Sequence, residues 1–143
     1  MRFHHGNYVF SRKELWNLDL YLAKIIRDGL KQFKKMERYS YPPEFSNPED
    51  WENALDKMIN AFDIIESSTF FEKNSPMMKY LIENPCITED IINNVTESNS
   101  NELKLEDIPK EIEEADKIYR KKTEKIITEG LELFSRYFRH IWD

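Results

Sequence analysis

The chain has 143 residues, 34% of which are charged, and its formal net charge at pH 7 is −6. This length is typical of a single domain with its own core, so one domain is expected over residues 1–143. The single cysteine, Cys86, excludes an intramolecular disulfide and a multi-cysteine zinc site. No apolar run reaches the length of a membrane span, and residues 1–20 lack the apolar segment of a signal peptide, so a cytoplasmic protein is expected.

Charge is unevenly distributed along the chain. Residues 1–43 carry 9 basic and 4 acidic side chains, a balance of +5, whereas residues 44–107 carry 4 basic and 15 acidic ones, a balance of −11. The acidic residues 44–107 are expected to attract the basic residues 1–43 within the molecule. Alternatively, they form an acidic surface that binds a basic partner such as a nucleic-acid-binding protein. Direct nucleic-acid binding is not expected, because the only concentrated basic run, Lys31 to Arg38, suits the end of a helix equally well.

Taken in chain order, residues 1–10 form no clear element, and their aromatic and apolar side chains are expected to pack as an extended arm on the rest of the protein. Residues 12–38 are predicted to form the first helix, since apolar side chains recur there at steps of three and four. Ser11 and Glu14 have the S-x-x-E spacing of a capping box. Gly29 costs a helix about 1 kcal/mol relative to alanine, so a close helix crossing is expected there.

Asp19 interrupts the apolar stripe of this first helix. It falls between Trp16 and Ala23 on the face that is expected to point inward. A buried carboxylate is costly unless a donor pairs with it. Asp19 is therefore expected to form a structural hydrogen bond or, alternatively, to belong to a ligand or partner site.

A second helix is predicted over residues 48–67. Asn47 is a favourable N-cap and Pro48 suits the first helical position. The apolar residues that follow have heptad-like spacing, which indicates a helix packed along one face.

Residues 69–104 are rich in asparagine and serine and are interpreted as an insertion. Short helices are predicted over 76–83, with Ser75 as its cap, and over 88–95. The polar run 96–101 is typical of a mobile loop.

The last helix is predicted over residues 108–141, with Pro109 in its first turn. Its C-terminal turns are apolar on most sides, so they are expected to be buried within the monomer or in a homodimer. Together with the two earlier helices it predicts an all-α protein with a three-helix bundle core.

The sequence has no glycine-rich phosphate loop and no dinucleotide fingerprint. A row of carboxylates along the second helix lies within about 80° of the helix circumference: Glu52, Asp56, Asp63 and Glu66. Mg²⁺ prefers carboxylate oxygens, so a metal-dependent nucleotide hydrolase of all-α type is an alternative function. The closely spaced Glu-Glu-x-x-Glu pattern of such enzymes is missing, however, and neither a catalytic residue nor a metal or other cofactor is predicted.

Three tryptophans begin or end the main helices: Trp16, Trp51 and Trp142. They are expected to form an aromatic cluster at one end of the bundle. A second alternative function follows from that cluster, because aromatic rings beside Arg12 or Arg139 suit a nucleobase and its phosphate, as in a nucleotide-binding sponge.

Three stretches share features with one set of proteins: SRKELWNLDLYLAKII from Ser11, WENALDKMINAF from Trp51 and EGLELFSRYFRHIWD from Glu129. They contain W-x-L-D followed by A-x-x-I, then W-x-x-x-L-D-x-M-I-x-A-F, then G-L-x-L-F with an aromatic ending. In these motifs the chain resembles a widespread set of small uncharacterised proteins from bacteriophages and mobile elements of Gram-positive and gut bacteria. The resemblance covers most of the chain except 69–104, and it implies a phage setting and a small accessory protein, without a known activity.

The shared Leu-Asp pairs of those motifs are matched by Asp19 and Asp56. Both follow a leucine downstream of a tryptophan, so they are expected to form a structural or ligand-binding polar pair that ties helix ends together near Trp16 and Trp51.

The leading prediction is a non-enzymatic accessory protein in the bacterial cytoplasm, which inhibits a bacterial defence protein or a host protein. The acidic block would supply the surface for a basic protein partner, and its candidate contact residues are Glu72, Glu83, Glu89, Asp90 and Glu97.

Overall fold

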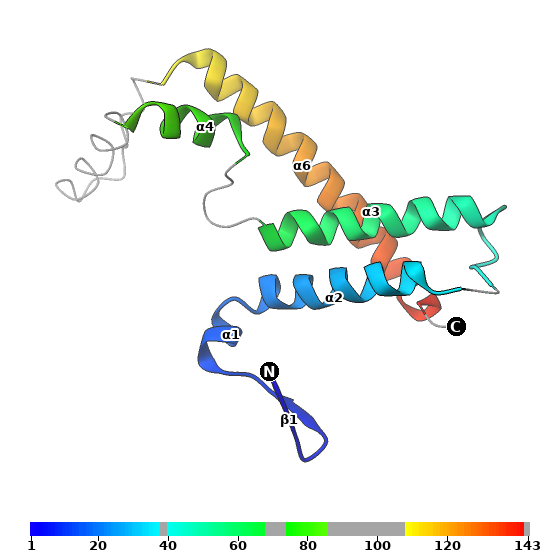
Figure 1. Ribbon diagram of the computed structural model, residues 1–143. Helices are drawn as coiled ribbons and strands as arrows, with labels where there is room; N and C mark the ends of the chain where they lie inside the picture. Colours follow the sequence, from blue (N-terminus) through cyan, green and yellow to red (C-terminus); the bar gives the residue numbers. More distant parts are fainter. Residues whose placement is uncertain (38–39, 68–73, 86–107, 142–143) are drawn as a thin grey trace. The chain divides into compact units, whose positions relative to one another are not determined.

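The computed structural model describes residues 1–37, 40–67, 74–85 and 108–141. In this part of the chain the protein is all-α apart from one small hairpin, as the sequence predicts (Figure 1). The chain forms two compact units, one of residues 1–68 with 125–143 and the other of residues 69–124. Helix α6 (Lys110–Tyr137) contributes its first half to the second unit and its second half to the first. A single domain over 1–143 stays a prediction.

The N-terminal residues form an antiparallel hairpin rather than a packed arm. Strand β1 (Arg2–His4) pairs with β2 (Asn7–Val9), and all six strand residues are exposed. The turn between them consists of His5 (φ 48°) and Gly6 (φ 80°). Two-residue hairpin turns of type I′ require a positive φ at both positions, which glycine adopts without strain.

The first predicted helix is in fact two helices, α1 (Arg12–Trp16) and α2 (Leu18–Lys35). The capping box is confirmed, because the Ser11 N–H donates to Glu14 Oε2 at 2.7 Å and the Glu14 N–H donates to Ser11 Oγ at 3.3 Å. The prediction of one uninterrupted helix over 12–38 is wrong, since Asn17 between them is non-helical (φ −120°, ψ 45°). Asparagine is among the poorer helix formers, so a break at this residue costs little.

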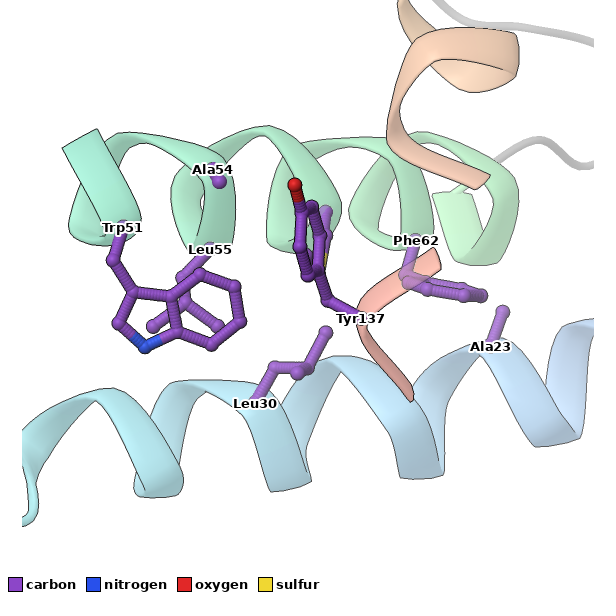
Figure 2. Close-up of a cluster of buried hydrophobic side chains, with 8 residues drawn as sticks. Ala23, Leu30, Trp51, Ala54, Leu55, Phe62 and Tyr137 are labelled. Atoms are coloured by element: carbon purple, nitrogen blue, oxygen red, sulfur yellow. The ribbon is translucent and has the colours of Figure 1, made fainter. Parts of the chain in front are cut away.

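Helix α3 (Pro48–Ser67) has the bounds that the sequence predicts. Asn47 caps its first turn, with Oδ1 accepting the Asp50 N–H at 2.8 Å. The helix lies beside α2, and side chains of α2, α3 and the second half of α6 form one core, as expected for a three-helix bundle (Figures 1 and 2). The buried residues of this core are Ala23, Leu30, Trp51, Ala54, Leu55, Met58, Phe62 and Tyr137.

Helix α6 crosses α3 closely at Gly130. A Cβ atom on Gly130 would lie 2.2 Å from Ala61 Cβ and 2.7 Å from the Lys57 carbonyl oxygen. Both distances are shorter than a van der Waals contact, so any side chain at this position would overlap with α3. The predicted crossing at Gly29 is wrong, because a Cβ atom there would meet nothing within 4 Å. Hence the position that requires glycine is in the last helix rather than in α2.

The second unit contains α4 (Pro76–Glu83), with the predicted bounds. Its N-cap is confirmed, since Ser75 Oγ accepts the Met78 N–H at 3.1 Å. The predicted helix 88–95 and the predicted loop 96–101 lie outside the described residues.

The last helix begins at Lys110 and ends at Tyr137, where a 3₁₀ turn, η1 (Phe138–His140), continues the chain. The expected burial of its last turns holds only in part, since Tyr137 is buried whereas Leu131 and Phe138 are exposed. Across the described ranges, helices that are long and apolar enough to cross a membrane are not found.

Candidate functional site

Ion pairs connect α2 and α3, and Arg27 is the centre of one group. Its Nη1 donates to Glu66 Oε2 at 2.7 Å and to Asp63 Oδ1 at 3.2 Å. Its Nε donates to Asp28 Oδ1 at 2.9 Å, a bond that raises the pKa of the guanidinium and lowers the pKa of the Asp28 carboxyl. Arg27 thus ties α2 to the C-terminal end of α3.

Lys34 forms the second group, near the other end of α2. Its Nζ lies 2.5 Å from Asp56 Oδ1 and 3.8 Å from Glu52 Oε2. Each of the four carboxylates in the metal alternative therefore faces a cation of α2, which a magnesium ion would have to displace. Among the residues that the structure describes, no group of three or more His, Cys, Asp or Glu side chains could hold a metal ion.

The predicted polar pair of Asp19 and Asp56 is not brought together by these contacts. Asp56 does join α3 to α2, but through Lys34. The prediction that Asp19 points inward is wrong, because this residue is exposed. Asp19 lies in the first turn of α2, where a carboxylate interacts favourably with the helix dipole.

In the second unit, Asp116 of α6 is the buried charge, with an exposed fraction of 5%. Its Oδ1 accepts the Met77 N–H at 3.1 Å, and its Oδ2 accepts Arg120 Nε at 2.6 Å. Burial by itself would raise the pKa of Asp116, but the bonds from Arg120, Met77 and Ser75 outweigh it and leave the pKa below its usual value. Asp116 thus caps the N-terminus of α4 from a different helix, which is a structural role.

We expect Asp116→Asn to destabilise the second unit by about 1–3 kcal/mol, because Met77 and Arg120 lose a charged acceptor. The folded pKa lies below that of the unfolded chain, so the carboxylate stabilises the fold fully at neutral pH. That contribution disappears as the pH falls below about 3.8 through the folded pKa. Hydrogen exchange of the α4 amides at two pH values measures this loss of stability. Glu114→Gln is the control, because Glu114 is an exposed residue on α6, the helix that carries Asp116. Equal protection of Met77 in both variants would contradict this role.

The tryptophans do not form the predicted cluster. Trp51 is 2% exposed and packs against Phe45 and Tyr137, with ring centroids 5.4 Å and 5.6 Å away. Trp16, by contrast, is 80% exposed on α1, so the prediction that it shares a cluster with Trp51 is wrong. Trp142 lies outside the described residues.

Large apolar side chains are exposed on the hairpin and α1, and we call this set the N-terminal surface: Met1, Phe3, Tyr8, Val9, Leu15 and Trp16. Phe3 and Tyr8 are 67% and 62% exposed, and they lie opposite each other across the hairpin with ring centroids 5.1 Å apart. Sequence reasoning missed this surface because the first ten residues were expected to pack on the bundle. The His5-Gly6 turn between two short runs was the available signal for a hairpin.

Contacts at both ends hold the hairpin against the helices. The N-terminal ammonium group of Met1 bonds to the Glu14 carboxylate, which lowers the pKa of Glu14 to about 2. Phe10 packs edge-on against Tyr21 of α2, with ring centroids 6.1 Å apart. Where the hairpin meets α1, a cleft of about 400 Å³ opens between Arg2, Val9 and neighbouring residues. The N-terminal surface is thus attached to α1 and α2 at defined points.

Of the five acidic residues predicted as partner contacts, only Glu83 belongs to the part of the chain that the structure describes. Glu83 is exposed at the C-terminal end of α4. The other four lie outside the described residues: Glu72, Glu89, Asp90 and Glu97.

Comparisons with protein families, with curated proteins and with solved structures gave no match to this chain. The resemblance to phage proteins therefore stays a prediction. Its motif residues have a structural explanation, because Trp51, Leu55 and Met58 are all buried in the core and Gly130 is the helix crossing. Shared motifs of this kind would report a shared fold rather than a shared site.

Proposed function

We propose that this protein is a non-enzymatic accessory protein of phage type that binds another protein through the N-terminal surface. The supporting observation is the exposure of Trp16, Phe3 and Tyr8 on adjacent elements. Exposed apolar residues that gather together, such as the Phe3–Tyr8 ring pair, are typical of interaction sites. Tryptophan and tyrosine are also the residues that most often dominate the binding energy of an interface, because they bury a large area at a low entropic cost.

The charges of the first unit support a protein-binding role over the hydrolase alternative. The four carboxylates of α3 are engaged by Arg27, Lys34 and Lys31 of α2, so they stabilise the helix pair. A hydrolase site needs carboxylates that converge on a metal with open positions. An inhibitor needs an accessible surface and no catalytic group, and the residues of the N-terminal surface are accessible.

Alanine substitutions at Trp16 and Phe3 test this function directly. We expect Trp16→Ala to weaken the complex by about tenfold or more, as is usual for a tryptophan anchor. The partner is first captured from the native host with the wild-type chain, and its affinity for each variant is then measured by calorimetry. Ile118→Ala is the matched control, because Ile118 is an exposed apolar residue (69%) in the second unit.

The same experiment separates the two surfaces. If Trp16→Ala and Phe3→Ala bind as tightly as the wild type while Glu83→Lys abolishes binding, the acidic block is the contact surface and the N-terminal assignment is wrong. Circular dichroism of each variant shows whether the fold is intact, which is expected because all three side chains are exposed.

A further inference from the structure

The charged side chains of the hairpin and α1 are nearly all positive. Residues 1–17 carry one acidic side chain, Glu14, and three basic ones: Arg2, Arg12 and Lys13. The Glu14 carboxylate is already engaged, because it bonds to the N-terminal ammonium group of Met1. Within the part of the chain that the structure describes, none of the three basic side chains forms an ion pair. The N-terminal surface therefore carries a positive charge that the described residues do not neutralise.

Two of these cations flank Trp16 on α1. Arg12 and Lys13 precede Trp16 by four and three residues, a spacing that makes side chains neighbours on a helix surface, with Cβ atoms about 5–6 Å apart. A long side chain on a helix leans toward the preceding turn, which here is the turn that carries both cations. All three residues are exposed. A partner that buries the Trp16 indole therefore also meets two positive charges.

The fold gives no reason for positive charge at these two positions. Arg27 and Lys34 of α2 bind carboxylates of α3, so they stabilise the helix pair. Helix α1, by contrast, has no buried residue. Arg12 and Lys13 lie in its first turn, where a cation interacts unfavourably with the partial positive charge of the helix end. Binding of an anionic partner would account for two cations that folding does not require.

On the basis of the proposed function, we propose that the N-terminal surface binds an acidic protein surface. An apolar pocket of the partner receives Trp16, and carboxylates beside that pocket pair with Arg12 and Lys13. An aromatic anchor within a charged rim is the usual anatomy of a protein interface. The partner is thus opposite in charge to the basic one that residues 44–107 predict.

A protein fits this surface better than a single-stranded nucleic acid does. Tryptophan and arginine also suit bases and phosphates, so both polyanions need to be considered. The N-terminal surface, however, includes the aliphatic side chains of Leu15 and Val9, which are 54% and 52% exposed. These side chains offer no ring on which a base could stack, whereas apolar side chains of a protein can bury them.

Selection from a library of random peptides tests the chemistry of the partner directly. Peptides that bind the wild-type chain are kept, and those that also bind Trp16→Ala are discarded, so the remaining peptides require the indole. We expect them to be enriched in aspartate and glutamate together with apolar residues. Peptides that require Trp16 without an excess of acidic residues show that the partner is not acidic, and the proposed function then stands alone. If no peptide requires Trp16, the N-terminal surface does not bind proteins and both proposals are wrong.

Charge reversal at the two cations measures their contribution. Arg12→Glu combined with Lys13→Glu should weaken the binding of a selected acidic peptide by about tenfold or more, and selection with this double variant should yield basic peptides instead. Acidic side chains suit the first turn of a helix, so the fold should be kept. Lys121→Glu is the control, because Lys121 is an exposed cation in the second unit, and it should bind like the wild type. Equal affinity of the double variant and the wild type contradicts the role of Arg12 and Lys13.

Single-stranded oligothymidine is the probe for the other class of partner. Fluorescence anisotropy with the wild-type chain should show no binding that depends on Trp16. If oligothymidine binds, and both Trp16→Ala and the double charge reversal abolish its binding, the surface recognises nucleic acid and the assignment of an acidic protein is wrong.

Discussion

Replacing Gly130 by alanine should lower the free energy of unfolding by about 3 kcal/mol or more. The new Cβ atom would lie 2.2 Å from Ala61 Cβ and 2.7 Å from the Lys57 carbonyl oxygen. The second of these is a backbone atom inside α3, so a side-chain rotation cannot relieve the overlap. Helix α6 would have to move away from α3, which would open the core around Met58, a side chain with no exposed surface. Overpacking of a dense core is costly for this reason.

Gly29→Ala is the matched control for this experiment. The chemical change is the same and both glycines are helical, but the Cβ atom at position 29 meets nothing within 4 Å. We expect this variant to gain about 1 kcal/mol from helix propensity. Chemical denaturation followed by circular dichroism, at a concentration where the chain is monomeric, measures both variants. Equal stability of Gly130→Ala and the wild type would show that α6 does not cross α3 at this point.

The glycines illustrate what the sequence could and could not predict. Helices over 48–67 and 76–83 were predictable to the residue, because a capping side chain followed by proline marks each start locally. Which glycine meets a neighbouring helix depends on the packing of elements that are distant in sequence. The cost of glycine inside a helix therefore predicted a helix crossing at Gly29, whereas the crossing is at Gly130.

The break at Asn17 had a larger effect on the candidate site. An uninterrupted helix would have placed Asp19 and Trp16 on the inward face, and both were interpreted as parts of a buried site. One non-helical residue separates α1 from α2 and leaves Trp16 exposed, whereas Asp19 is exposed as part of the first turn of α2 itself. The periodicity of apolar residues does not report such a break, because the pattern continues on either side. The exposure of Trp16 was missed for this reason, whereas that of the hairpin was missed because residues 1–10 were expected to pack on the bundle.

Trp51→Ala should cost about 3–5 kcal/mol of unfolding free energy, the second large effect that we expect. The Trp51 ring packs against Phe45 and Tyr137, whose own ring centroids are 5.0 Å apart, so three aromatic rings support one another. Removing the indole leaves a cavity that the two remaining rings cannot fill, since each is held by a different segment of the chain. Figure 2 shows the Trp51 side chain on the inner side of α3, above α2.

Trp16→Ala supplies the comparison, since it removes the same side chain from a position that is 80% exposed. Its stability should stay within about 0.5 kcal/mol of the wild type, as for most surface substitutions. Denaturant titrations of the two variants measure the difference in their unfolding free energies, when both are fitted with the same dependence on denaturant concentration. If Trp16→Ala were as damaging as Trp51→Ala, Trp16 would be packed in solution and the N-terminal surface would not be free to bind a partner. A stable Trp16→Ala chain that has lost its partner would instead separate binding from folding, because the exposed indole contributes nothing to the core and its removal can act only on the complex.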